Sequence, residues 1–284
     1  MKTFDIIIIG AGPAGGQCAR ILAKSNPRVL LVEQHEDFSK NDFSSAATPL
    51  ETLAKFQLPE TVVGTYWQKL EIVSTNNSHI WESNAKLGAV FNFAKLREFL
   101  ANEVKEYGGE VWMGCRYIRH FQEGDKTLVE LRKKGGEKIT ISTKVLIDAT
   151  GSARAVIGDL HSNKTDFLTG SGIEYLIEVS PEVYQQYAQK LVFFLGHKWM
   201  PKGYSWIFPM EAKLNRLKVG SARCHLEHKY INPKESIRWY LELLLKDYLK
   251  LSPSEYKLID LHGSTVKYSA GLKDVYYRGN VVAI

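Results

Sequence analysis

The first 33 residues constrain the fold most strongly. A β-branched apolar run, residues 5–9, is followed at once by the glycine-rich segment 10–15. The run has the composition of a strand buried on both faces of a parallel sheet, and residues 17–23 then carry small and apolar side chains at helical spacing. A second apolar run, residues 28–32, ends on Glu33. The order strand, glycine turn, helix, strand predicts a βαβ unit at the start of an α/β fold.

The glycines of this segment have separate tasks in a dinucleotide-binding turn. Gly10 permits the tight turn, Gly12 lets backbone N–H groups approach a pyrophosphate, and Gly15 lets the helix pack against the strand. Pro13 and Ala14 stand in the first helical turn, whose free N–H groups attract an anion. We therefore predict that these five residues bind a dinucleotide, with an ordinary βαβ unit as the alternative.

Two further segments complete the predicted cofactor site. Glu33 stands about 20 residues beyond the glycines, where a dinucleotide site places an acid that accepts hydrogen bonds from ribose hydroxyls. Gln34 follows directly and is counted with it. Later an apolar strand, residues 144–148, ends in Ala149, Thr150 and Gly151, where glycine allows the backbone to approach a ligand.

Composition narrows the class of protein. With 284 residues, 44% of them hydrophobic, the chain can bury a core in one large or two interleaved domains. Its formal charge of +6 favours anionic partners, but the cations are scattered and nothing indicates a nucleic-acid partner. The three cysteines lack metal-ligand spacing, so we expect no metal and a cytoplasmic location. No segment reaches the roughly 20 apolar residues of a spanning helix, so any membrane contact would be peripheral.

The later pattern predicts two sheets. Residues 93–107 form an amphipathic helix, and the strand signals at 110–113, 127–131, 138–141 and 144–148 follow it. Beyond residue 152 alternating strands dominate, with one long helix at 233–249. We expect a Rossmann-like parallel sheet with an interleaved, mostly antiparallel sheet domain. The predicted boundaries are 1–40, 88–160 and 268–284 for the dinucleotide-binding domain, and 41–87 and 161–267 for the substrate-binding domain.

A resemblance to a known family rests on residues 203–209, Gly-Tyr-Ser-Trp-Ile-Phe-Pro. Together with the glycine turn and the Ala-Thr-Gly strand end, this stretch resembles the geranylgeranyl reductase family, within the flavoproteins built like para-hydroxybenzoate hydroxylase. The resemblance spans nearly the whole chain and implies FAD as cofactor, with NADPH or another electron donor. In the family the stretch lines the cavity beside the flavin, so Tyr204, Trp206 and Phe208 would bind substrate. The alternative is that alternating aromatics on a strand simply form core.

The family reduces isolated carbon–carbon double bonds of prenyl chains. The resemblance therefore implies an FAD-dependent oxidoreductase that delivers hydride from reduced flavin to a prenylated or similarly apolar small molecule. The sequence identifies no catalytic proton donor. A flavin-dependent monooxygenase or halogenase is a second reading, in which Lys69 would be the halogenase lysine, although Tyr204 and Phe208 depart from the halogenase motif. A third reading is an inactive, truncated flavoprotein paralogue.

Several departures from the family bear on substrate and cofactor binding. Residues 43–47 replace a Cys-Gly-Gly-type stretch, Phe93 replaces an Arg that commonly opens the helix, and residues 220–222 reduce a Gly-x-Gly to Gly-Ser-Ala. Thr150 stands where the larger class usually has Asp, although Asp148 lies two residues earlier. Residues 277–284 resemble the strand that runs into a Gly-Asp turn at the flavin ribityl, and the chain stops before that turn. The resemblance therefore implies C-terminal truncation, with weak FAD binding and no activity of this chain alone.

Overall fold

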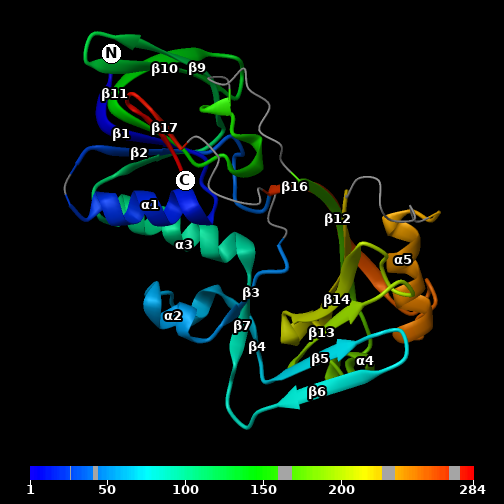
Figure 1. Ribbon diagram of the computed structural model, residues 1–284. Helices are drawn as coiled ribbons and strands as arrows, with labels where there is room; N and C mark the ends of the chain where they lie inside the picture. The colour runs from blue at the N-terminus through cyan, green and yellow to red at the C-terminus, as the bar shows by residue number, and fades with distance from the viewer. Residues whose placement is uncertain (26, 41–43, 159–167, 226–233, 269–275) are drawn as a thin grey trace. The chain divides into compact units, whose positions relative to one another are not determined.

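The computed structural model describes residues 1–25, 27–40, 44–158, 168–225, 234–268 and 276–284. The chain forms two compact units, each assembled from separate stretches of sequence (Figure 1). Unit 1 comprises Met1–Asp42, Ala94–Asp166 and Gly271–Ile284, and unit 2 comprises Phe43–Phe93 and Phe167–Ala270. The glycine turn therefore lies in unit 1 and the aromatic strand in unit 2.

Unit 1 is built on a parallel sheet with the strand order β18-β11-β1-β2-β8. Ile7 and Ile9 of β1 pack against one face with Leu131, whereas Ile8 packs against the other face with Ala19. Both faces of the sheet are covered, which explains why the run at residues 5–9 is continuously apolar. The strands are β1 (Thr3–Ile9), β2 (Val29–Val32), β8 (Glu110–Trp112), β11 (Lys138–Asp148) and β18 (Val281–Ala283), with β17 (Tyr277–Arg278) antiparallel to β18.

Two helices cover one face of this sheet and a hairpin covers the other. Helices α1 (Pro13–Ala23) and α3 (Phe93–Glu106) lie side by side below the sheet in Figure 1, and an ion pair of 3.0 Å joins the buried Arg20 of α1 to the partly buried Glu103 of α3. Strands β9 (Cys115–Glu123) and β10 (Lys126–Lys133) lie on the opposite side. The predicted helix at 93–107 is thus confirmed to within one residue.

Strand β11 corrects one sequence-based expectation. We expected separate strands at 138–141 and 144–148, but one strand runs through Ser142 and Thr143. The hydroxyl of Thr143 donates to the carbonyl of Asp5, so these polar residues continue the ladder between β1 and β11. The first half of β11 pairs with β10 and the second half with β18.

Unit 2 contains a seven-stranded sheet with the order β16-β12-β15-β14-β13-β5-β6, antiparallel except where β13 meets β5. One face packs on α5 (Ile237–Leu243), which continues as a π-helical turn, Leu244–Tyr248. Ser236 caps α5, and the predicted helix start at residue 233 lies outside the described residues. The strands are β5 (Lys69–Val73), β6 (Ser78–Glu82), β12 (Leu168–Glu178), β13 (Lys190–Leu195), β14 (Gly203–Met210), β15 (Arg216–Cys224) and β16 (Lys257–Tyr268), and a short helix α4 spans Pro181–Gln185.

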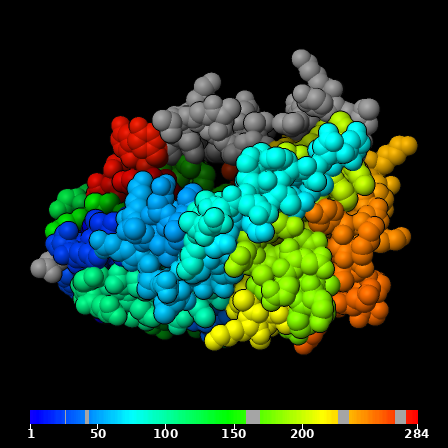
Figure 2. All heavy atoms as spheres, turned by 90° about the horizontal axis from the view of Figure 1, so that it is seen from below, coloured from blue at the N-terminus to red at the C-terminus, as the bar shows by residue number. Residues whose placement is uncertain are grey.

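A small three-stranded sheet belongs to the same unit. Its strands are β3 (Ala47–Pro49), β7 (Gly88–Phe91) and β4 (Val63–Trp67), and α2 (Glu51–Lys55) follows β3. Figure 2 shows the cyan residues of this region and of the β5–β6 hairpin against lime-green residues, in agreement with the pairing of β5 with β13.

The small sheet corrects one predicted boundary. We placed residues 88–160 with the dinucleotide-binding domain, but residues 88–93 lie in unit 2 because β7 pairs on both edges, with β3 and with β4. The predicted boundaries after residues 40, 160 and 267 fall in or beside segments outside the described residues. The expected fold class, a Rossmann-like parallel sheet with an interleaved and mostly antiparallel sheet, is confirmed. Among the described helices, none is long and apolar enough to cross a membrane.

Candidate functional site

The glycine turn after β1 is too tightly packed for side chains at two positions. Gly10 has a φ of +104°, and a Cβ atom there would lie 2.5 Å from the carbonyl oxygen of Ala149. A Cβ atom on Gly15 would lie 1.9 Å from the carbonyl oxygen of Gly10. The turn, the first turn of α1 and the end of β11 therefore meet through backbone atoms, as a dinucleotide fold requires.

The space in front of α1 is open where an anion would approach. A Cβ atom on Gly12 would meet no atom of the described residues within 4 Å, apart from its own chain neighbours. Gly12 is the N-cap of α1, no side chain caps the helix, and Pro13 occupies the first turn. Pro13 and Ala14 are exposed. The free N–H groups and the positive end of the helix dipole thus face an unfilled space, and this geometry fits the pyrophosphate of a dinucleotide such as FAD.

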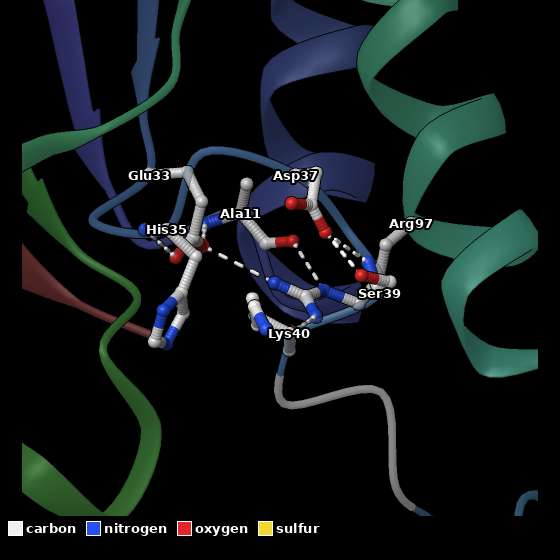
Figure 3. Close-up of polar contacts among 7 residues, drawn as sticks. All are labelled: Ala11, Glu33, His35, Asp37, Ser39, Lys40 and Arg97. Atoms are coloured by element: carbon white, nitrogen blue, oxygen red, sulfur yellow. Dashed lines mark hydrogen bonds and ion pairs between the residues drawn. The ribbon is translucent and has the colours of Figure 1, made fainter.

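Glu33 is held by three groups of the protein (Figure 3). Its buried carboxylate accepts hydrogen bonds from the N–H of Ala11 at 3.1 Å and from the N–H of His35 at 3.0 Å. Arg97 donates a third at 3.3 Å, to the oxygen that Ala11 also contacts. A carboxylate has about four lone-pair positions, so the Oε1 atom that faces His35 retains the capacity to accept one more donor. A ribose hydroxyl would fit that capacity.

Arg97 is the site residue that the sequence analysis missed. Its buried guanidinium, on α3, also donates to the carbonyl oxygens of Ala11 at 3.1 Å and Lys40 at 3.0 Å, and it lies 5.1 Å from the ring centre of Phe38. It therefore joins α3, the glycine turn, Glu33 and the loop after β2 (Figure 3). A charged residue at a buried position of an amphipathic helix was the signal that could have identified it.

The predicted residues at the end of β11 lie next to the glycine turn. Asp148 is buried, and its carboxylate accepts hydrogen bonds from the N–H groups of Thr150, Val156 and Ile157 at 2.9–3.0 Å. The Thr150 hydroxyl donates a hydrogen bond to the Asp148 carboxylate at 2.6 Å. Gly151 adopts a φ of +61° with open space at its Cβ position. Asp148 thus folds the loop that presents Ala149–Gly151 beside Gly10. Gln34 is exposed at the end of β2.

The three predicted substrate-binding residues have different environments in unit 2. Trp206 and Phe208 are 8% and 3% exposed and pack with Val90 and Met210, whereas Tyr204 is 43% exposed. The indole N–H of Trp206 donates to the buried carboxylate of Glu174 at 2.9 Å. Two of the three aromatics therefore contribute to the core of unit 2, and Tyr204 offers the most accessible surface.

The remaining candidates are placed as follows. A Cβ atom on Gly220 would lie 2.1 Å from the ring of Trp206, so the first glycine of the reduced Gly-x-Gly is needed for packing. Lys69 of β5 makes an exposed ion pair of 3.1 Å with Glu82 on the neighbouring strand β6. Among the described residues, no three or more His, Cys, Asp or Glu side chains gather in a way that could hold a metal ion.

Residues 5–157, more than half of the chain, match the FAD dependent oxidoreductase family. The chain belongs to this family. The predicted resemblance to prenyl reductases is also confirmed, because a digeranylgeranylglycerophospholipid reductase of Haloferax volcanii is 34% identical over 216 residues, which cover 72% of this chain and 50% of the relative. The chain spans about half the length of the curated relatives it matches.

Two solved structures illustrate how the fold of this chain is shared. A geranylgeranyl bacteriochlorophyll reductase-like protein of Thermoplasma acidophilum has a TM-score of 0.84 at 19% identity, and the match covers 100% of this chain and 71% of that one. A p-nitrophenol 4-monooxygenase of Pseudomonas putida has a TM-score of 0.75 at 16% identity, with 100% and 72% covered. At these identities the likeness concerns the fold.

Proposed function

We propose that this chain acts as an FAD-dependent reductase of carbon–carbon double bonds in prenylated or similarly apolar substrates. The observation that carries the proposal is the 34% identity to a relative named as a digeranylgeranylglycerophospholipid reductase. NADPH or another donor would supply the electrons. A prenylated lipid resides in a membrane, so the protein would contact the membrane surface to reach it. Such a contact would be peripheral.

The proposed roles follow from the chemistry of the groups in unit 1. The free N–H groups at the start of α1 would hold the pyrophosphate of FAD, because the space at Gly12 is open and uncapped. Glu33 would accept a hydrogen bond from a ribose hydroxyl at its Oε1 atom, while hydrogen bonds from Arg97 and from the N–H of Ala11 hold its Oε2 atom. When bound and reduced by the electron donor, FAD would supply the hydride that adds to the double bond.

Unit 2 would supply the apolar contacts for the substrate. Tyr204 is 43% exposed, and Phe193 lies beside it with ring centres 6.1 Å apart. Burial raises the pKa of Tyr204, so its hydroxyl stays protonated at neutral pH. An exposed aromatic surface of this kind gains free energy when a prenyl chain covers it.

Cofactor binding is tested first, with Gly12→Val as the diagnostic variant. The purified chain is titrated with FAD, and binding is followed by the quenching of flavin fluorescence. The valine side chain would occupy the approach of the pyrophosphate without meeting protein atoms near its Cβ, so the variant should fold and lose FAD binding. Circular dichroism checks its fold. A Gly12→Val variant that binds FAD as the parent does would contradict the proposed pyrophosphate site.

Turnover is tested second. The chain is loaded with FAD, reduced with dithionite without oxygen, and incubated with a geranylgeranylated lipid whose mass is then measured. The proposal predicts a gain of two hydrogen atoms for each reduced double bond, and none with Gly12→Val. A chain that binds FAD but leaves the lipid mass unchanged would contradict the proposed reductase activity of this chain and would agree with the expectation that it is inactive alone, while leaving the cofactor site intact.

A further inference from the structure

A basic hollow lies in unit 1 beside the loop that follows β2. Its volume is about 380 Å³, and its cationic lining comes from this loop and from the facing ends of β9 and β10. Of the residues predicted to bind the cofactor, only Gln34 lines it. The cationic side chains and the imidazole that line it are His35, Lys40, Arg116, Arg132, Lys133 and Lys134.

Two arginines face each other across the strands in this hollow. Arg116 of β9 and Arg132 of β10 are direct partners in the antiparallel register. Both side chains are exposed, and neither guanidinium group makes a hydrogen bond or an ion pair with any residue that the structure describes. Like charges placed directly opposite on neighbouring strands destabilise a sheet, so an anion bound between the two guanidinium groups would relieve this repulsion.

The acidic groups in the hollow do not neutralise these arginines. Glu36 pairs with Lys134 at 2.5 Å, and Lys133 pairs with Glu137 at 3.1 Å. Asp37 accepts hydrogen bonds from the hydroxyl and the N–H of Ser39, which lower its pKa and keep it ionised. The charge of Lys40 also lowers the pKa of Asp37, so Lys40 offsets that carboxylate, and the positive charge left over belongs to Arg116 and Arg132.

We propose that this hollow binds the phosphate monoester group of a small molecule. A planar guanidinium donates two parallel hydrogen bonds to a phosphate, and two guanidinium groups on adjacent strands can hold a dianion between them. His35 also lines the hollow, and its imidazole can donate a further hydrogen bond. This site does not depend on the FAD site or on the proposed reaction, because the glycine turn takes no part in it.

The neighbouring surface indicates what the rest of the ligand is like. A second hollow of about 770 Å³ shares Glu36, Gly114, Lys133 and Lys134 with the first. It adds the apolar side chains of Trp112, Met113, Ile139 and Ile141. The organic part of the ligand is therefore aromatic or aliphatic, and two sources share this chemistry: a nucleotide with a terminal phosphate on its ribose, and a prenyl phosphate.

The test is calorimetric titration of the 284-residue chain with inorganic phosphate, adenosine 2′-monophosphate and geranyl phosphate. The informative variants are Arg116→Gln and Arg132→Gln. Arg119→Gln is the matched control, because Arg119 lies on the same strand, carries the same charge and pairs with Glu130 at 2.7 Å outside both hollows. Circular dichroism confirms that each variant is folded.

The proposal predicts saturable binding of at least one monoester, weakened about tenfold or more by Arg116→Gln and by Arg132→Gln but less than about twofold by Arg119→Gln. Tighter binding of adenosine 2′-monophosphate than of geranyl phosphate supports a nucleotide ligand, and the reverse order supports a prenyl phosphate. Equal loss in all three variants, or no saturable binding of any ligand, overturns the proposal, because the hollow would then act only as diffuse surface charge.

Discussion

Replacing Arg97 with Met tests whether a buried ion pair organises the candidate cofactor site. The change removes the guanidinium while keeping most of the side-chain length. It leaves the buried carboxylate of Glu33 without its cationic partner and the carbonyl oxygens of Ala11 and Lys40 without their donor. Breaking a buried pair by removing one partner costs about 3–5 kcal/mol, because the remaining charge is uncompensated. We therefore expect Arg97→Met to lower the free energy of unfolding of unit 1 by about that amount.

The assay is urea unfolding at neutral pH, combined with amide hydrogen exchange at Ala11 and His35, whose N–H groups bond to Glu33. Glu33→Gln removes the orphaned charge, so the double variant should be more stable than Arg97→Met alone. Lys133→Met is the control, because Lys133 and Glu137 form an exposed pair, and it should lower the free energy of unfolding by less than about 1 kcal/mol. If Arg97→Met lowers the free energy of unfolding no more than this control does, the ion pair does not organise the site. The same conclusion follows if the changes in free energy caused by Arg97→Met and by Glu33→Gln are additive in the double variant.

Three further outcomes are expected. Gly15→Ala should destabilise unit 1 by about 3 kcal/mol or more in urea unfolding, because the new Cβ would lie 1.9 Å from the Gly10 carbonyl oxygen; a parent-like urea midpoint would contradict this packing. Burial raises the pKa of Tyr187 to about 12. The protonated hydroxyl therefore favours the folded state fully below about pH 10, and this contribution to the free energy of unfolding is lost as the pH rises towards 12. In Tyr187→Phe the free energy of unfolding should fall by about 2–3 kcal/mol less over the same pH range, which unfolding curves at alkaline pH would measure. Burial also raises the pKa of the Cys115 thiol. At about pH 8 Cys115 of the folded protein should therefore react with a thiol reagent far more slowly than Cys115 of the protein unfolded in urea, and equal rates would contradict its burial.

Local patterns predicted the elements that have a single strong signal. The β1 run could be identified because its residues are apolar on both faces, and the helix at 93–107 because its apolar side chains recur at helical spacing. The pattern failed at β7, because Gly88–Phe91 reads as a strand that could join either sheet. Only its pairing with β3 and β4 decides the choice, and pairing over long distances leaves no local trace.

The sequence predicted the candidate site where the close packing of backbone atoms permits only one residue type. Gly10 and Gly15 follow from close packing that no other residue allows. Arg97 did not follow, because its partners are carbonyl oxygens and a carboxylate from three separate segments. The burial of Trp206 depended in the same way on Val90, which lies on a strand far away in the sequence.

The shared edge of β11 has a consequence for how the chain folds. Its first half can pair with β10 as soon as that neighbouring hairpin exists, whereas Leu146–Asp148 must wait for Val281–Ala283, after the whole of unit 2 has been synthesised. Closing so long a loop is entropically slow, and an unpaired strand edge can recruit the wrong partner in the meantime. Refolding experiments should therefore show the β9–β10–β11 ladder protected early and the β11–β18 ladder late, and this interval is when the chain is most exposed to aggregation.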